Sequence, residues 1–110
     1  GLPPTAEVLR IGRDAQGLSL PALLDALAGR QVNELHLEGG PRMNAAWLAQ
    51  GLVDELLLYM APRILGPGRP LADLPPLQRL SDSLDWRPHG APELLGGDLR
   101  WRLVKACRDA

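Results

Sequence analysis

The sequence has few aromatic and sulfur-containing side chains: among 110 residues there are no Phe, one Tyr, three Trp and one Cys. A single thiol, Cys107, cannot form an intramolecular disulfide, which fits a reducing compartment such as the cytoplasm. We interpret Cys107 as a bystander near the C-terminus. The chain lacks any run of about 18 apolar residues, so we expect no membrane-spanning helix. It opens with Gly rather than Met, which suggests a piece of a longer protein.

An excess of charge of one sign is also missing, because 12 Lys and Arg face 13 Asp and Glu. The arginines are scattered and interleaved with acids, so we expect no nucleic-acid partner, which would need a basic face. His36, His89 and Cys107 have no paired spacing, and we therefore predict no metal site.

What is present is a 45% hydrophobic composition, ordinary for one globular domain with a sizeable core. Residues 66–76 hold four prolines and two glycines, which excludes a regular helix or an inner strand. We interpret this stretch as a loop within one domain rather than a linker, since the roughly 35 residues after it are too few for a separate core.

The first part of the chain alternates between strand and helix patterns. We predict strands at Glu7–Ile11, Glu34–Glu38 and Asp54–Ala61, with helices at Ser19–Gly29 and Pro41–Gln50. The unbroken apolar run in the third strand indicates burial on both faces. This order predicts an α/β fold with a parallel βαβαβ arrangement.

The last part of the chain alternates differently. Asp98–Val104 places apolar residues on one side and Arg100 and Arg102 on the other, which is typical of an antiparallel strand with one wet face. Leu84–Arg87 is either its hairpin partner or a separate short strand. The sheet is thus expected to be mixed, with flanking helices. An uncovered edge or face would need missing upstream sequence or a second copy, so we expect a homo-oligomer, a dimer.

The segment with the clearest chemical character is Leu37–Met43 (LEGGPRM). Here a predicted strand ends at Glu38, and two glycines that permit positive φ lead into a helix at Pro41. The free amides at a helix N-terminus attract phosphate. We interpret the segment as an anion-binding turn with a carboxylate at its edge. The alternative is a tight turn whose glycines serve only sterics; it matches neither a Walker loop nor a dinucleotide fingerprint.

Three blocks extend this pattern: Glu38–Pro41 (EGGP), Gly51–Leu57 (GLVDELL) and Tyr59–Gly66 (YMAPRILG). With Gly97–Val104 (GDLRWRLV), their order and spacing resemble the C-terminal reductase domain of the bifunctional riboflavin-biosynthesis deaminase/reductase. The resemblance covers about Leu18 to Val104. It implies a dihydrofolate-reductase-like fold and NADPH-dependent reduction of 5-amino-6-(5-phosphoribosylamino)uracil, in which the ribosyl becomes a ribityl chain.

The resemblance also implies site residues. Glu38 matches the carboxylate that contacts the substrate. The segment that wraps the NADPH phosphates corresponds to Gly40, Pro41, Arg42, Met43, Asn44, Ala45 and Ala46. Two positions depart from the family pattern, since Arg42 stands where Thr is frequent and Asn44 where a small residue is common. Arg42 could replace a lost hydroxyl contact with a charge-assisted one.

Several other polar residues could have either a functional or a purely structural role. Asp54 and Glu55 are better explained as solvated acids at a strand entry than as site contacts. Tyr59 is better explained by the core or an interface than by catalysis, and Arg63 as a surface charge rather than a phosphate ligand.

The family's reductase domain is about twice this long, so we interpret residues 1–110 as its C-terminal portion. The upstream half and the deaminase domain would lie in the complete protein, and we expect the isolated chain to have little or no activity. Two alternatives are a non-catalytic assembly or dimerisation module, and a different reductase of the same fold.

Overall fold

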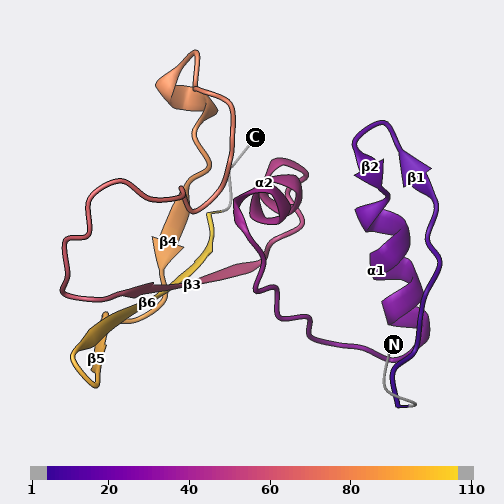
Figure 1. Ribbon diagram of the computed structural model, residues 1–110, viewed down its shortest axis with the longest axis horizontal. Coiled ribbons are helices and arrows are strands. Elements are labelled where there is room, and N and C mark those ends of the chain that lie inside the picture. Colours follow the sequence, from indigo (N-terminus) through magenta and orange to yellow (C-terminus); the bar gives the residue numbers. More distant parts are fainter. Residues whose placement is uncertain (1–4, 107–110) are drawn as a thin grey trace. The chain divides into compact units, whose positions relative to one another are not determined.

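The computed structural model describes residues 5–106, so Cys107 lies outside the described residues. The chain forms two compact units, the first ending at Glu38 and the second beginning at Gly39. Figure 1 shows a helix with a small hairpin in the first unit, and a helix with a sheet in the second.

The first unit contains a hairpin that sequence patterns did not predict. Strand β1 (Arg13–Asp14) pairs antiparallel with β2 (Gly17–Leu18). In the turn between them, the Asp14 carboxylate accepts a hydrogen bond from the Gln16 amide at 2.9 Å. Gly17 has a φ of 119°, which only glycine adopts without strain.

Helix α1 (Leu20–Gly29) confirms the helix predicted at Ser19–Gly29. Ser19 is its N-cap, and the Ser19 hydroxyl accepts a hydrogen bond from the Ala22 amide at 3.3 Å. Gly29 is the last helical residue, but the left-handed residue beyond the helix is Gln31, with a φ of 62°. An ion pair of 2.7 Å joins the Arg30 guanidinium to the Glu7 carboxylate within this unit.

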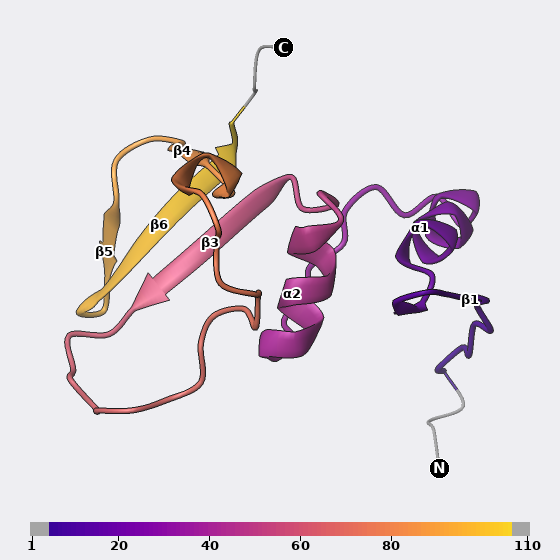
Figure 2. The same ribbon diagram turned by 90° about the horizontal axis from the view of Figure 1, so that it is seen from above.

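The second unit begins with helix α2 (Pro41–Ala49), which confirms the helix predicted at Pro41–Gln50. The sheet follows, interrupted by a short 3-10 helix, η1 (Leu80–Asp82). Its strands are β3 (Glu55–Met60), β4 (Trp86–Pro88), β5 (Glu93–Leu95) and β6 (Asp98–Lys105). β6 is central, with β3 on one side and β4 and β5 on the other. Figure 2 shows β3 and β6 side by side, with α2 next to the start of β3.

The predicted antiparallel pairing in the C-terminal part is confirmed. The structure also shows whether residues 84–87 form the hairpin partner of the last strand or a separate short strand. β4 pairs with the end of β6 as a separate short strand. The hairpin partner of β6 is β5, joined through Gly96 and Gly97, whose φ values are 58° and 92°. A Gly-Gly pair at positive φ is a known two-residue hairpin signal, so this hairpin has a local cause in the sequence.

The predicted parallel βαβαβ arrangement is not formed within residues 5–106, where every strand pairing is antiparallel. Residues 7–11 and 34–38 belong to no strand. A ladder needs a neighbouring backbone, and no described strand pairs with either segment. The residues have strand composition, but their pairing partners are not among the strands described.

Burial of β3 on both faces was also a wrong prediction. Leu56 and Leu58 are half-buried, whereas Tyr59 is 60% exposed. The register explains the difference, because Leu57 lies opposite Arg102 and Tyr59 opposite Arg100. An apolar run in the sequence shows only the composition of a strand. The residues on the neighbouring strand determine whether each side of the sheet is shielded from water.

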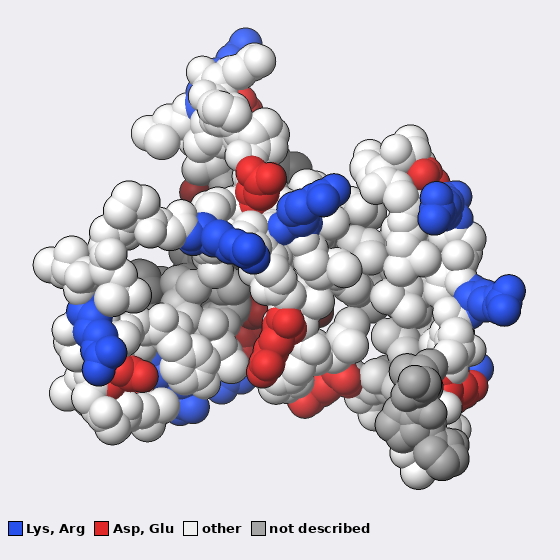
Figure 3. Space-filling model, in the orientation of Figure 1, with Lys and Arg blue, Asp and Glu red and all other residues white. Residues whose placement is uncertain are grey.

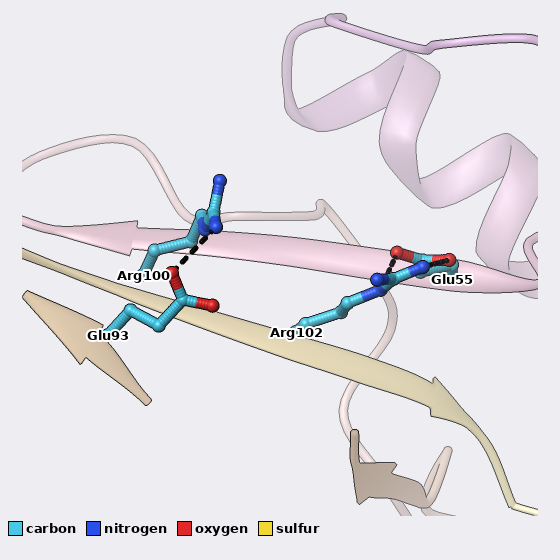
Figure 4. A network of polar contacts seen from close by, with 4 residues as sticks. All are labelled: Glu55, Glu93, Arg100 and Arg102. Carbon is cyan, nitrogen blue, oxygen red and sulfur yellow. Dashed lines mark hydrogen bonds and ion pairs between the residues drawn. The ribbon is translucent and has the colours of Figure 1, made fainter. Parts of the chain in front are cut away.

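Figure 4 shows the polar character of this sheet face, with two ion pairs between neighbouring strands. Arg100 contacts Glu93 at 2.8 Å, and Arg102 pairs with Glu55. These pairs are largely exposed, so each stabilises the sheet only modestly.

The core is smaller than composition predicted. Among residues 5–106 only four apolar side chains are buried: Leu20, Trp47, Leu48 and Leu103. Large apolar residues such as Ile64, Leu65 and Leu94 are almost fully exposed. Much of the large apolar composition therefore lies outside the core.

Candidate functional site

The glycine turn lies at the surface, at the start of α2. Gly40 is the N-cap residue and has no side chain that could accept the amides of the first turn. Within residues 5–106, the amides of Arg42 and Met43 donate no hydrogen bond to the chain. Because the first amides of a helix have no partner in the helix, they are available to an anion.

Neither glycine of the turn has the positive φ that the sequence reading allowed for. Gly40 has a φ of −79°, and Gly39 is not among the left-handed residues. Gly39 is required for a different reason: a Cβ there would lie 2.9 Å from Cβ and Cγ of Met43. A Cβ at Gly40 would meet nothing within 4 Å, so the space in front of the helix start is open.

The other predicted cofactor residues occupy the first two turns of α2. Arg42 and Met43 are exposed, while Ala45 and Ala46 are half-buried. Arg42 makes no ion pair within the described part of the chain. The first turn also lacks an acidic residue, although the helix dipole favours one there.

Asn44 does not present a free carboxamide. Its Nδ2 donates a hydrogen bond of 2.8 Å to the Leu71 carbonyl in the proline-rich loop. Its Oδ1 lies 3.5 Å from the Cβ position of Gly39. A second hydrogen bond of 3.0 Å runs from the Asp73 amide to the Pro41 carbonyl. No sequence signal could have found these contacts, because the acceptors are backbone carbonyls.

Glu38, the predicted substrate contact, is an exposed carboxylate and the last residue of the first unit. It directly precedes Gly39 in the sequence. The turn as a whole is therefore accessible, as an anion-binding segment must be.

A pocket of about 300 Å³ lies at the opposite end of α2, away from the glycine turn. Leu48, Leu84 and Trp86 give it an apolar lining, and Asp82 and Asp85 add charge. Lys105 also lines it and donates a hydrogen bond of 2.7 Å to the Gly51 carbonyl. None of the predicted site residues lines this pocket.

The other polar residues with two interpretations lie in or beside β3. Glu55 pairs with Arg102 at the strand entry, and Arg63 is a surface charge. A hydrogen bond with the Tyr59 hydroxyl, and then the nearby Glu93 carboxylate, raise the pKa of Arg100. Tyr59 is therefore a surface partner of an arginine and not a core residue.

No group of three His, Cys, Asp or Glu side chains within residues 5–106 could hold a metal ion. In the same part of the chain, no helix has the length and apolar character needed to cross a membrane. Basic and acidic side chains are interspersed on the face shown in Figure 3.

These features define a mixed helix-and-sheet protein with a surface glycine turn at the start of a helix. The sequence matches the RibD C-terminal domain over residues 4–109, and the chain belongs to this family.

Relatives agree with this assignment. The chain is 40% identical over 82 residues to the riboflavin biosynthesis protein RibD of Escherichia coli, covering 74% of this chain and 22% of that protein. It is 36% identical over 81 residues to a 2,5-diamino-6-ribosylamino-4(3H)-pyrimidinone 5′-phosphate reductase of Methanothermobacter thermautotrophicus, covering 72% and 37%. The chain thus spans well under half of these relatives.

A solved structure of Acinetobacter baumannii RibD superimposes with a TM-score of 0.73 at 27% identity. The match covers 81% of this chain and 25% of that protein. The dihydrofolate-reductase-like fold class predicted from the sequence is therefore confirmed.

Proposed function

We propose that this chain is the C-terminal part of an NADPH-dependent reductase of riboflavin biosynthesis. Its substrate would be 5-amino-6-(5-phosphoribosylamino)uracil, whose ribosyl group becomes a ribityl chain. The observation that carries the proposal is the exposed turn at Gly39–Met43, with unbonded amides, in a chain of the RibD C-terminal domain family.

The residues present fit a nucleotide phosphate at the turn. The amides of Arg42 and Met43 can donate to phosphate oxygens, and the open space at Gly40 lets the group approach the backbone. The exposed guanidinium of Arg42 can add a charge-assisted hydrogen bond, and the anion would offset the unfavourable placement of Arg42 in the helix dipole. The small side chains of Ala45 and Ala46 leave room for a ligand along the part of α2 that follows this turn.

A reduced nicotinamide held at this turn would supply the hydride for the sugar carbon bonded to the amine nitrogen; the bond from that carbon to the ring oxygen would break, and the oxygen would take up a proton. The protein's part is to bind and orient. The Glu38 carboxylate would accept hydrogen bonds from the substrate's N–H or hydroxyl groups and so hold the substrate. No protein nucleophile is needed.

The isolated chain would lack much of this site. Residues 5–106 bury only four apolar side chains and leave the strand-like segments 7–11 and 34–38 without a described pairing partner, as expected of a domain whose remaining strands lie elsewhere in the protein. We therefore propose two kinds of partner: the upstream part of the complete protein, including a deaminase domain, and a second copy in a cytoplasmic dimer.

A second substrate has one observation in its favour. A relative of similar identity is named for a diaminopyrimidinone ribosyl phosphate rather than for the uracil compound. Both substrates share the ribosylamine that is reduced, and they differ only in the pyrimidine ring. The two should therefore be compared directly.

The test is turnover by the complete protein that carries this chain, followed by the fall in NADPH absorbance with each substrate. We expect reduction of the uracil compound, and a loss of roughly ten- to hundredfold in kcat/KM for Glu38→Gln, which corresponds to about 1.4 to 2.7 kcal/mol in the transition state. Circular dichroism of the variant controls for folding. Absence of NADPH binding to the complete protein would refute the proposal. A preference for NADH or for the diaminopyrimidinone would correct only the cofactor or the substrate.

A further inference from the structure

The proline-rich loop at residues 66–76 has little to hold it in place. All of its side chains are exposed except Ala72, which is half-buried. Among residues 5–106, two hydrogen bonds tie it to α2: Asn44 Nδ2 to the Leu71 carbonyl at 2.8 Å, and the Asp73 amide to the Pro41 carbonyl at 3.0 Å. We refer to Leu71–Asp73 as the strap. Figure 2 shows the chain leaving β3, swinging outward and returning to lie beside α2.

Both ties end on the first turn of α2, which is the proposed nucleotide turn. Pro41 provides one acceptor in that turn, and Asn44 follows it by three residues. The Asn44 carboxamide also reaches the other way, with its Oδ1 3.5 Å from the Cβ position of Gly39. Asn44 thus hydrogen-bonds to the strap, while its Oδ1 faces the space beside Gly39 in the glycine turn.

We propose that Asn44 is a positioning residue that holds the strap against the nucleotide turn, and that the strap thereby forms a fixed wall beside the bound cofactor. The inference rests on the proposed function and deepens it. It differs from the expectation that Asn44 itself contacts the NADPH phosphates, because one of the two Nδ2 hydrogens of Asn44 already donates to the Leu71 carbonyl.

The physical argument is one of preorganisation. A loop that must be ordered when a ligand binds lowers affinity by the entropy of ordering it. Four prolines already limit the loop's freedom, so two hydrogen bonds are enough to hold the strap in one place. Removing one of them should weaken cofactor binding with little effect on the chemical step.

The experiment uses the complete protein and measures its NADPH dissociation constant by fluorescence titration. We expect Asn44→Ala to raise this constant about five- to tenfold, the size of one lost hydrogen bond, with kcat nearly unchanged. Asn44→Gln keeps a carboxamide donor and should restore part of the affinity. Gln50→Ala removes a carboxamide at the other end of α2 and serves as the matched control.

A second variant acts on the strap without touching Asn44. Asp73→Pro removes the amide that donates to Pro41, and it should weaken NADPH binding by a similar factor. Asp73→Ala keeps the amide and is its control. Hydrogen exchange of the Asp73 amide reports the strap directly, and this exchange should accelerate about five- to tenfold in Asn44→Ala.

The outcomes separate the two proposals. If the wild-type protein does not bind NADPH, the proposed function fails. If it binds, but Asn44→Ala leaves both affinity and Asp73 exchange at wild-type values, only the positioning role is refuted. Weaker binding in Asn44→Ala with unchanged Asp73 exchange and a normal Asp73→Pro would show direct contact with the cofactor, and would also overturn it.

Discussion

Helices α1 and α2 begin in similar ways but differ in the side chain of the N-cap residue. Each has a proline in its first turn, and each is preceded by an N-cap residue in extended conformation. At α1 the hydroxyl of Ser19 accepts the Ala22 amide, whereas Gly40 at α2 has no side chain to do so. A capped start stabilises its own helix, while an uncapped start leaves donors for a ligand. The difference indicates that α2 gives up local stability where the proposed nucleotide would bind.

The largest effect is expected from Gly39→Ala. The new Cβ would lie 2.9 Å from two carbons of Met43, so the start of α2 must shift. We expect a loss of about 1–3 kcal/mol in unfolding free energy, measured by chemical denaturation. Gly12→Ala, where a Cβ meets nothing within 4 Å, is the control in the first unit. Equal stability of both variants would contradict the steric role of Gly39.

Gly40→Ser makes the start of α2 resemble that of α1. The backbone of Gly40, at φ −79° and ψ −179°, suits serine. The hydroxyl should cap the free amides and raise helix stability by a few tenths of a kcal/mol. It would also compete with phosphate, so we expect NADPH affinity to fall about tenfold, or about 1.4 kcal/mol. Unchanged affinity would mean that the amides do not bind the cofactor.

Ser19→Ala removes the cap of α1 and tests the other half of the comparison. The Ala22 amide loses its acceptor, and we expect about 1 kcal/mol of destabilisation by thermal unfolding. NADPH affinity should stay the same, because Ser19 is not part of the proposed turn. A parallel loss of affinity would show that α1 has a role at the site.

The smallest effect concerns the exposed pair of Glu7 and Arg30 in the first unit. The hydrogen bond from Arg30, and then its charge, lower the pKa of Glu7. A lowered carboxyl pKa stabilises the folded state above the unfolded pKa, and this contribution is lost as the pH falls through the folded value. NMR titration should show the lowered pKa, and Arg30→Ala should raise it toward the ordinary value.

Helices and strands were predictable from the sequence where the residues that stabilise them lie within the same short stretch of chain. Both helices were predicted within one residue at either end, because their leucines or alanines, first-turn prolines and caps lie within about ten residues. β6 was predicted because its alternation of apolar residues with Arg100 and Arg102 is local. The β5–β6 hairpin was equally local, and it was missed only because the Gly96–Gly97 signal was overlooked.

The faces of β3, the pairing of residues 7–11 and 34–38, and the role of Asn44 were not predictable in this way. Each depends on a neighbour distant in the sequence: Arg102 opposite Leu57, a ladder partner that is not among the described strands, and the Leu71 carbonyl. The sequence by itself determined the helices, the glycine turn and the family. Only the tertiary structure decided which strand faces are wet and what Asn44 contacts, since cross-strand partners and backbone acceptors are brought together by folding and leave no trace in the local pattern.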